Sequence, residues 1–165
     1  MAWFGWSVAL QGSTVVVGAY GATISGRPGQ GAAYVWTRAG TGASATWVYR
    51  GKLTAHDGAS WDAFGFSVAT DDGWIAVGAG GATIAGDPYR GAAYLFQRTG
   101  NRWRQAAKLT APDGGAWSYF GDSLSMSNGR LVVGADGSSV AGAPMRGAAY
   151  VYRRPNPATW QFEAK

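Results

Sequence analysis

The sequence predicts an all-β protein made of four-stranded antiparallel units, and three observations support that prediction. A block of residues that begins with Phe-Gly, continues with Gly-Ala and ends with Gly-Ala-Ala-Tyr occurs three times in the 165 residues. Between these motifs, runs of β-branched and aromatic residues are separated by turns rich in Gly, Asn and Asp, as in short strands. The repeat length of roughly 55 residues matches one four-stranded blade of a β-propeller. The matching glycines are Gly5, Gly65 and Gly121, then Gly18, Gly78 and Gly134, then Gly31, Gly91 and Gly147.

Each repeat divides into four strands, and residues 1–165 are expected to form a single repeat domain. The expected first strands are 6–10, 66–70 and 122–126, the second 14–18, 74–78 and 130–134, the third 32–37, 92–97 and 148–153, and the fourth 47–53, 103–109 and 160–165. The three blades therefore span about 4–53, 64–109 and 120–165, and the loops 54–63 and 110–119 join them. No stretch has the periodicity of an amphipathic helix, so essentially no helix is expected.

The turns between the first and second strands are short, and two of them contain Asp-Gly or Asn-Gly, at 72–73 and 128–129. These pairs supply the positive φ angles that tight hairpins need. Residues 41–45 lengthen the hairpin between the third and fourth strands of the first repeat. The glycines and alanines of the second and third strands predict close packing near a propeller axis. The aromatic residue that follows them is expected to fill the space between blades, at Trp36, Phe96 and Tyr152.

Composition and charge limit the classes of function. The chain has no cysteine, which excludes a disulfide scaffold and a cysteine-ligated metal site. Its formal net charge is +5, but the basic residues are scattered, so we expect a solvated surface and no nucleic-acid partner. A basic protein with exposed aromatic residues can still bind acidic polysaccharides. No signal peptide is expected at the start of this chain, and no apolar stretch is long enough for membrane insertion.

The three in-register copies of these motifs resemble FG-GAP repeats, the family of the integrin-α-type β-propeller. The resemblance covers nearly the whole chain and includes the tail Trp…Lys-Leu-Thr-Ala-x-Asp-Gly at 47–58 and 103–114. It implies an extracellular or cell-surface propeller of the adhesion type. Members of the family often carry an Asp-x-Asp-x-Asp-Gly calcium loop between the first and second strands. Here that turn holds only the adjacent Asp71 and Asp72, so no calcium site and no other cofactor are expected.

Three blades cannot close a ring, whereas the family normally closes with seven. An open set of three blades leaves one apolar flank on the first blade and another on the third, and such surfaces promote association. Two chains arranged head-to-tail would complete a six-bladed ring with two-fold symmetry, so the sequence predicts a homodimer. The alternative is that the chain is a fragment of a longer protein, which predicts poor solubility or irregular association.

The expected ligand-binding face gathers the loops between the second and third strands and the loops between blades. These are the longest loops, at 20–30, 80–90, 136–146, 54–61 and 110–117. Tryptophan beside arginine and aspartate suits a glycan, because the ring stacks on the sugar and the charged groups hydrogen-bond its hydroxyls. The candidate ligand-binding residues are Trp61, Trp117, Asp57, Asp113, Arg27, Arg90, Arg146, Tyr20 and Tyr89. The structural alternatives are that the tryptophans fill the gap between blades and that the aspartates cap their own turns.

Catalysis is not expected from this sequence. The single histidine, His56, occurs in one repeat only, and the recurring serines at Ser7, Ser67 and Ser123 are interpreted as structural. No carboxylate pair, metal-ligand spacing or phosphate loop stands out. The sequence therefore predicts a non-enzymatic, lectin-like or protein-binding recognition module that acts in cell adhesion. The alternative hypothesis is a self-assembling propeller fragment, or an engineered building block, with no ligand of its own.

Overall fold

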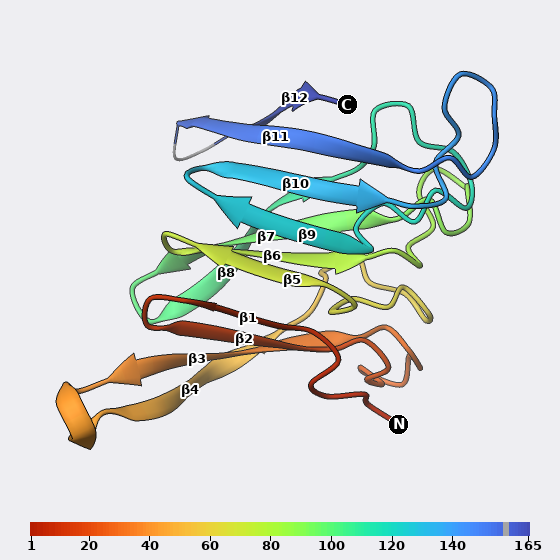
Figure 1. Cartoon of the computed structure of the whole chain (residues 1–165). Coiled ribbons are helices and arrows are strands. Elements are labelled where there is room, and N and C mark those ends of the chain that lie inside the picture. The colour runs from red at the N-terminus through yellow and green to blue at the C-terminus, as the bar shows by residue number, and fades with distance from the viewer. Residues whose placement is uncertain (157–158) are drawn as a thin grey trace.

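The computed structural model describes residues 1–156 and 159–165, which form three four-stranded antiparallel sheets (Figure 1). Blade 1 contains β1 (Val8–Gln11), β2 (Thr14–Ala19), β3 (Ala32–Ala39) and β4 (Thr46–Leu53). Blade 2 contains β5 (Val68–Asp71), β6 (Trp74–Ala79), β7 (Ala92–Thr99) and β8 (Arg102–Leu109). Blade 3 contains β9 (Ser123–Ser127), β10 (Arg130–Ala135), β11 (Ala148–Asn156) and β12 (Thr159–Ala164). Within each blade the strands pair in sequence order, and blade 2 lies between blades 1 and 3.

The predicted four strands of each repeat are confirmed, but the first strands begin later than predicted. The sequence prediction starts them at Trp6, Phe66 and Asp122, whereas β1, β5 and β9 start at Val8, Val68 and Ser123. The Phe-Gly motif explains the difference, because it forms a turn. The Trp6 N–H donates to the Trp3 carbonyl at 3.2 Å, and the Phe66 N–H donates to the Ala63 carbonyl at 3.0 Å. Among the described residues, the only helix is the 3-10 helix Gly42–Ser44, in the lengthened hairpin between β3 and β4.

The Asp-Gly and Asn-Gly turns adopt the positive φ angles that the sequence predicts. The φ angle is 41° at Asp72 and 74° at Gly73, and it is 50° at Asn128 and 69° at Gly129. Turns of this handedness match the twist of the strands that they join. These tight hairpins lie at the end of the blades opposite the long loops (Figure 1).

The hydrophobic core lies between the blades. One cluster of buried side chains joins Val35 of blade 1 to Phe64 of blade 2. A second cluster joins Leu95, on the other face of blade 2, to Phe120 of blade 3. Phe64 and Phe120 are both completely buried. Because each blade buries its faces only against a neighbour, the blades depend on one another for stability.

The aromatic residue predicted to fill the space between blades does so in blades 2 and 3. Phe96 and Tyr152 are 3% and 4% exposed and belong to the two clusters. Trp36 occupies the same repeat position in blade 1, where its ring packs against Phe4 and Tyr49. Phe4 is 58% exposed and Tyr49 is 52% exposed. Blade 1 therefore presents to the outside the surface that blades 2 and 3 bury.

The second strands of blades 1 and 2, β2 and β6, make direct backbone contact with the next blade. A Cβ atom at Gly78 would overlap the carbonyl oxygen of Gly121, so only glycine fits there. The Ser67 hydroxyl donates a hydrogen bond of 2.6 Å to the same oxygen. The same three positions make the contact between blades 1 and 2, at Ser7, Gly18 and Gly65. The recurring serines and glycines thus hold neighbouring blades together.

Asp122 replaces an aromatic residue at the inner edge of blade 3, where blades 1 and 2 have Trp6 and Phe66. Its carboxylate reaches toward Gly80, and it lines a cavity of about 600 Å³ together with Asp136. Burial, and then the charge of Asp136, raise the pKa of Asp122 from 3.8 to about 6. Between these two values the folded chain binds a proton that the unfolded chain does not. The free energy of unfolding therefore falls as the pH rises through this range.

We predict that Asp122→Asn stabilises the chain at neutral pH and removes this pH dependence. The ionised carboxylate is disfavoured in the fold, so the variant should gain about 1–2 kcal/mol at neutral pH and nothing below the unfolded-state pKa. Urea unfolding across a pH series measures the difference. The control is Asp72→Asn, because the Asp72 side chain is 88% exposed. This variant should show the same dependence of unfolding free energy on pH as the wild type. Parallel profiles for wild type and Asp122→Asn would contradict the prediction.

We also predict that Phe120→Ala strongly destabilises the fold. Phe120 is completely buried between blades 2 and 3, so truncation should lower the free energy of unfolding by about 3–5 kcal/mol. The matched control is Met145→Ala, which removes a side chain that is 78% exposed and should change stability by less than about 0.5 kcal/mol. Chemical denaturation measures both. Equal effects would mean that the core does not lie between the blades.

Candidate functional site

The long loops gather at one end of the blades, and we call this end the loop face (Figure 1). The connections β2–β3, β6–β7 and β10–β11 lie there, together with the two connections between blades and the N-terminus. Every candidate ligand-binding residue belongs to one of these connections. The fold thus brings them to one face, and their side-chain contacts then distinguish two groups.

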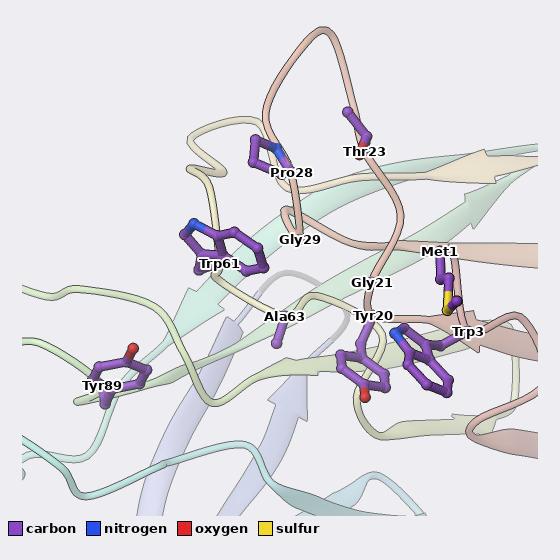
Figure 2. Close-up of a pocket in the computed structure, with 10 residues that line it drawn as sticks. All are labelled: Met1, Trp3, Tyr20, Gly21, Thr23, Pro28, Gly29, Trp61, Ala63 and Tyr89. Atoms are coloured by element: carbon purple, nitrogen blue, oxygen red, sulfur yellow. The ribbon is translucent and has the colours of Figure 1, made fainter.

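Aromatic side chains surround a cavity of about 390 Å³ on the loop face. Three of the candidate residues line it, namely Tyr20, Trp61 and Tyr89, and Trp3, Met1 and five smaller residues form the rest of the wall. Figure 2 shows Trp61 on one side of the cavity, with Trp3 and Tyr20 on the other. The cavity therefore offers ring surfaces from two directions.

Trp61 is held at the surface by its own backbone. Its N–H donates to the Pro28 carbonyl at 2.9 Å, and the residue is 66% exposed. The indole ring covers Gly29, where a Cβ atom would collide with it. Its φ angle of 70° lies in the left-handed region, which bulky residues seldom adopt. Trp61 does not fill the gap between blades, because Phe64 occupies that position.

Trp117 repeats this arrangement in the next connection. Its φ angle is 64°, its N–H donates to the Pro88 carbonyl at 2.9 Å, and it is 52% exposed. Its ring stacks on Tyr89 with the centroids 4.5 Å apart and the planes at 17°. Tyr119 packs against both rings. Because Tyr89 also lines the cavity, it joins the cavity to this second aromatic group.

We call these residues together the aromatic surface: Trp3, Tyr20, Trp61, Tyr89, Trp117 and Tyr119. Sequence reasoning missed Trp3 and Tyr119 as candidates. Both directly precede a Phe-Gly motif, and both have a φ angle of 52°, so the repeat alignment contained a signal for them. Trp3 lies parallel to Tyr20, with the ring centroids 6.2 Å apart, and it is 51% exposed.

The two candidate aspartates are bound by the blade that follows them. Asp57 accepts a hydrogen bond from Lys108 Nζ at 2.6 Å, and Asp113 accepts one from the Tyr150 hydroxyl at 2.7 Å. Asp113 also pairs with Lys165 Nζ at 2.5 Å, and these two donors lower the pKa of Asp113, Lys165 more strongly. Burial opposes ionisation of Asp57, but its contacts with Lys108 and Tyr94 together outweigh burial, so the pKa of Asp57 is lowered too. Each aspartate thus fastens an inter-blade loop to a blade.

Two of the candidate arginines also hold the loops. Arg27 Nη1 donates to the Gly58 carbonyl at 3.0 Å. Arg90 forms an ion pair of 3.2 Å with Asp87, and its other terminal nitrogen donates to a carbonyl of the inter-blade loop at 3.4 Å. Arg146 is at the equivalent position of blade 3, and its side chain has no hydrogen-bond partner in residues 1–156 and 159–165. Of the three arginines, Arg146 is the one whose side chain makes no such bond in the described part of the chain.

His56 and Asp71, which lie outside the candidate set, make hydrogen bonds within the fold. The backbone N–H of His56 donates to Gln105 Oε1 at 3.1 Å. Asp71, at the position of the family's calcium loop, accepts a hydrogen bond from the Gly129 N–H at 3.4 Å. Within the described part of the chain, no three side chains of metal-binding type form a group. No helix found in residues 1–156 and 159–165 has the length and apolar character needed to cross a membrane.

Comparison with known proteins agrees with the three-fold repeat. The family model described as the FG-GAP repeat matches residues 1–36, 47–96 and 103–152. Each of these regions contains a Phe-Gly motif and ends in the third strand of a blade, and the second and third regions begin in the last strand of the blade before. No curated protein matches the chain. Since the matched regions cover well over half of the sequence, the chain belongs to the FG-GAP repeat family.

Proposed function

We propose that this FG-GAP chain is a non-enzymatic recognition module that binds a glycan through the aromatic surface of its loop face. The observation that supports this function is that Trp3, Trp61 and Trp117 are exposed on left-handed backbone, and that Trp3 and Trp61 line one cavity together with Tyr20 and Tyr89. An extracellular protein of the adhesion type is the setting that the family suggests. Neither a cofactor nor a metal has a role in the proposal.

The aromatic surface is retained at an energetic cost to the fold. A left-handed backbone costs a non-glycine residue roughly 1–2 kcal/mol. Gly29 occupies in blade 1 the position that Tyr89 occupies in blade 2, with φ angles of 64° and 52°, so glycine fits this backbone. Trp61 covers Gly29 and Trp117 stacks on Tyr89, but the two residues are still 66% and 52% exposed. Ala63 and Met145 share this backbone, so it belongs to the repeated loops, and the support for binding is that three of the rings on it are exposed.

A glycan fits the chemistry of the cavity. Trp61 and Trp3 offer ring faces on opposite sides, and such faces stack on the apolar face of a sugar ring. The hydroxyls of Tyr20 and Tyr89 donate and accept hydrogen bonds, as sugar hydroxyls require. The net charge of +5 favours an acidic sugar. The volume of about 390 Å³ lies in the usual range for small-ligand sites.

The second candidate function is a self-assembling propeller that has no ligand of its own. The exposed apolar side chains on the open flanks of blades 1 and 3 favour it, because they remain in contact with water when the chain is isolated. Assembly and ligand binding use different surfaces, so the two functions are compatible. A glycan array probed with the labelled chain distinguishes them, since an assembly without a ligand produces no binding signal.

We predict that Trp61→Gly combined with Trp117→Gly weakens glycan binding while the fold stays intact. Glycine relieves the left-handed backbone, so the free energy of unfolding should change by less than about 1 kcal/mol. Loss of two stacking rings should raise the dissociation constant of the best-binding glycan of the array by at least about tenfold in calorimetric titration. The matched control is Met145→Gly, an exposed residue with a φ angle of 53° outside the aromatic surface, which should bind normally.

Two outcomes contradict this prediction. Unchanged glycan affinity in the double variant would remove the aromatic surface from the site. A loss of stability of about 3 kcal/mol or more would mean that the tryptophans are structural.

A further inference from the structure

We propose that the open flanks of blades 1 and 3 bind a second copy of the chain head-to-tail, so that two copies close a six-bladed ring. The open flank of each blade is the sheet face that points away from blade 2 (Figure 1). This surface is separate from the loop face, so the proposal goes beyond ligand binding. Its basis is the blade-to-blade interface that the chain already contains twice.

The open flank of blade 1 is apolar and exposed. Val8 is 69% exposed, Leu10 is 66% exposed and Phe4 is 58% exposed. A hollow of about 350 Å³ on this flank is lined by Phe4, Val15, Val17, Trp36 and Trp47. Contiguous apolar surface of this kind is a mark of protein contact.

The open flank of blade 3 is made of smaller residues. A shallow hollow of about 170 Å³ is lined by Ser123, Leu124, Ser125, Val132, Gly134 and Ala149. Val132 is 38% exposed, whereas Ala76, at the same repeat position in blade 2, is completely buried. Large side chains on one flank and small ones on the other give complementary shapes.

Each open flank repeats a flank that is already buried inside the chain. The equivalent positions are Phe4 and Phe64, Trp36 and Phe96, Ala149 and Ala93, and Val151 and Leu95. In every pair the second residue is buried between blades. A second copy can therefore be bound with the packing that already joins blades 1, 2 and 3.

The open flanks also carry the hydrogen-bonding groups that join blades inside the chain, namely a serine hydroxyl and a glycine carbonyl. The serines of blades 1 and 2 donate to a glycine carbonyl of the next blade, whereas Ser123 has no acceptor among the described residues. A Cβ atom at Gly134 would meet only Ser123 of its own blade, while at the equivalent glycines it would overlap the next blade's carbonyl. Gly5 of a second copy offers the missing carbonyl, since it is the glycine of a Phe-Gly motif.

The inner edge of the ring is complementary in the same way. Phe66 of blade 2 packs against Trp6 and Tyr20 of blade 1. At the junction between copies, Trp6 takes the place of Phe66, and Asp122 and Asp136 take the places of Trp6 and Tyr20. The indole N–H of Trp6 would then lie close to two carboxylates, which are its natural acceptors.

The number of blades sets the number of copies. A head-to-tail contact makes a ring only when the rotations add up to a full turn. Propellers typically have about four to eight blades, so two copies with six blades fit and three copies with nine do not. The ring axis relates the two copies, and both loop faces then lie on the same side. A ligand with repeated units could bind both aromatic surfaces at once, which increases avidity.

The mass of the intact chain in solution tests the proposal. We expect particles of twice 17.2 kDa at tens of micromolar, by light scattering coupled to size exclusion. In the double variant Ser123→Ala with Gly134→Ala, a methyl group fills the space for the partner's carbonyl, and the hydroxyl that would obstruct it is gone. We expect at least about a tenfold increase in the dissociation constant of the pair. Circular dichroism checks that the variant is folded.

The matched control is Ser60→Ala with Gly115→Ala, which changes the same atoms in exposed inter-blade loops where a Cβ atom at Gly115 meets nothing. It should associate like the wild type. A second variant, Phe4→Asp, places a charge on the opposite flank at a site that is 58% exposed, and should also produce monomers. A wild-type chain that stays monomeric, an open series of sizes, or a pair that resists both variants would overturn the proposal.

Discussion

The structure depends on the close approach of one blade's backbone to the next. At Gly18 and Gly78 the carbonyl oxygen of the following Phe-Gly motif occupies the space of a side chain. A serine hydroxyl binds the same oxygen, so the contact is both tight and directional. This approach brings Phe64 and Phe120 into the gap, where they are completely buried. Because a four-stranded blade has two faces and no core of its own, its stability comes from these neighbours.

The rigid stack also decides how the loop face is built. Asp57, Asp113, Arg27 and Arg90 fasten the loops to one another and to the next blade. With the loops held by these polar contacts, Trp3, Trp61 and Trp117 remain exposed on left-handed backbone. Charged side chains that lose contact with water need partners within the protein, whereas an exposed aromatic ring is stabilised when a ligand covers it.

The same contact links recognition to assembly. Blade 1 ends the stack with an uncovered aromatic face, and blade 3 ends it with an uncovered serine and glycine. These two surfaces are the halves of an interface that the chain uses internally. If they meet in a second copy, both aromatic surfaces lie on one side of a ring, and weak binding to each site becomes stronger binding to a repeated ligand.

The spacing of Phe-Gly and Gly-Ala-Ala-Tyr was sufficient to predict three blades, four strands in each, the hairpin turns and the small residues between blades, because these depend on local geometry. The later start of β1, β5 and β9 was not predicted, because the N–H groups of Trp6 and Phe66 donate to carbonyls three residues earlier and form a turn where the residue types favour a strand. Nor could the sequence separate fastening residues from exposed ones. Asp57 and Trp61 stand four positions apart, yet Lys108 binds the first and the Pro28 carbonyl holds the second at the surface. Those partners are distant in the chain, and only folding brings them together.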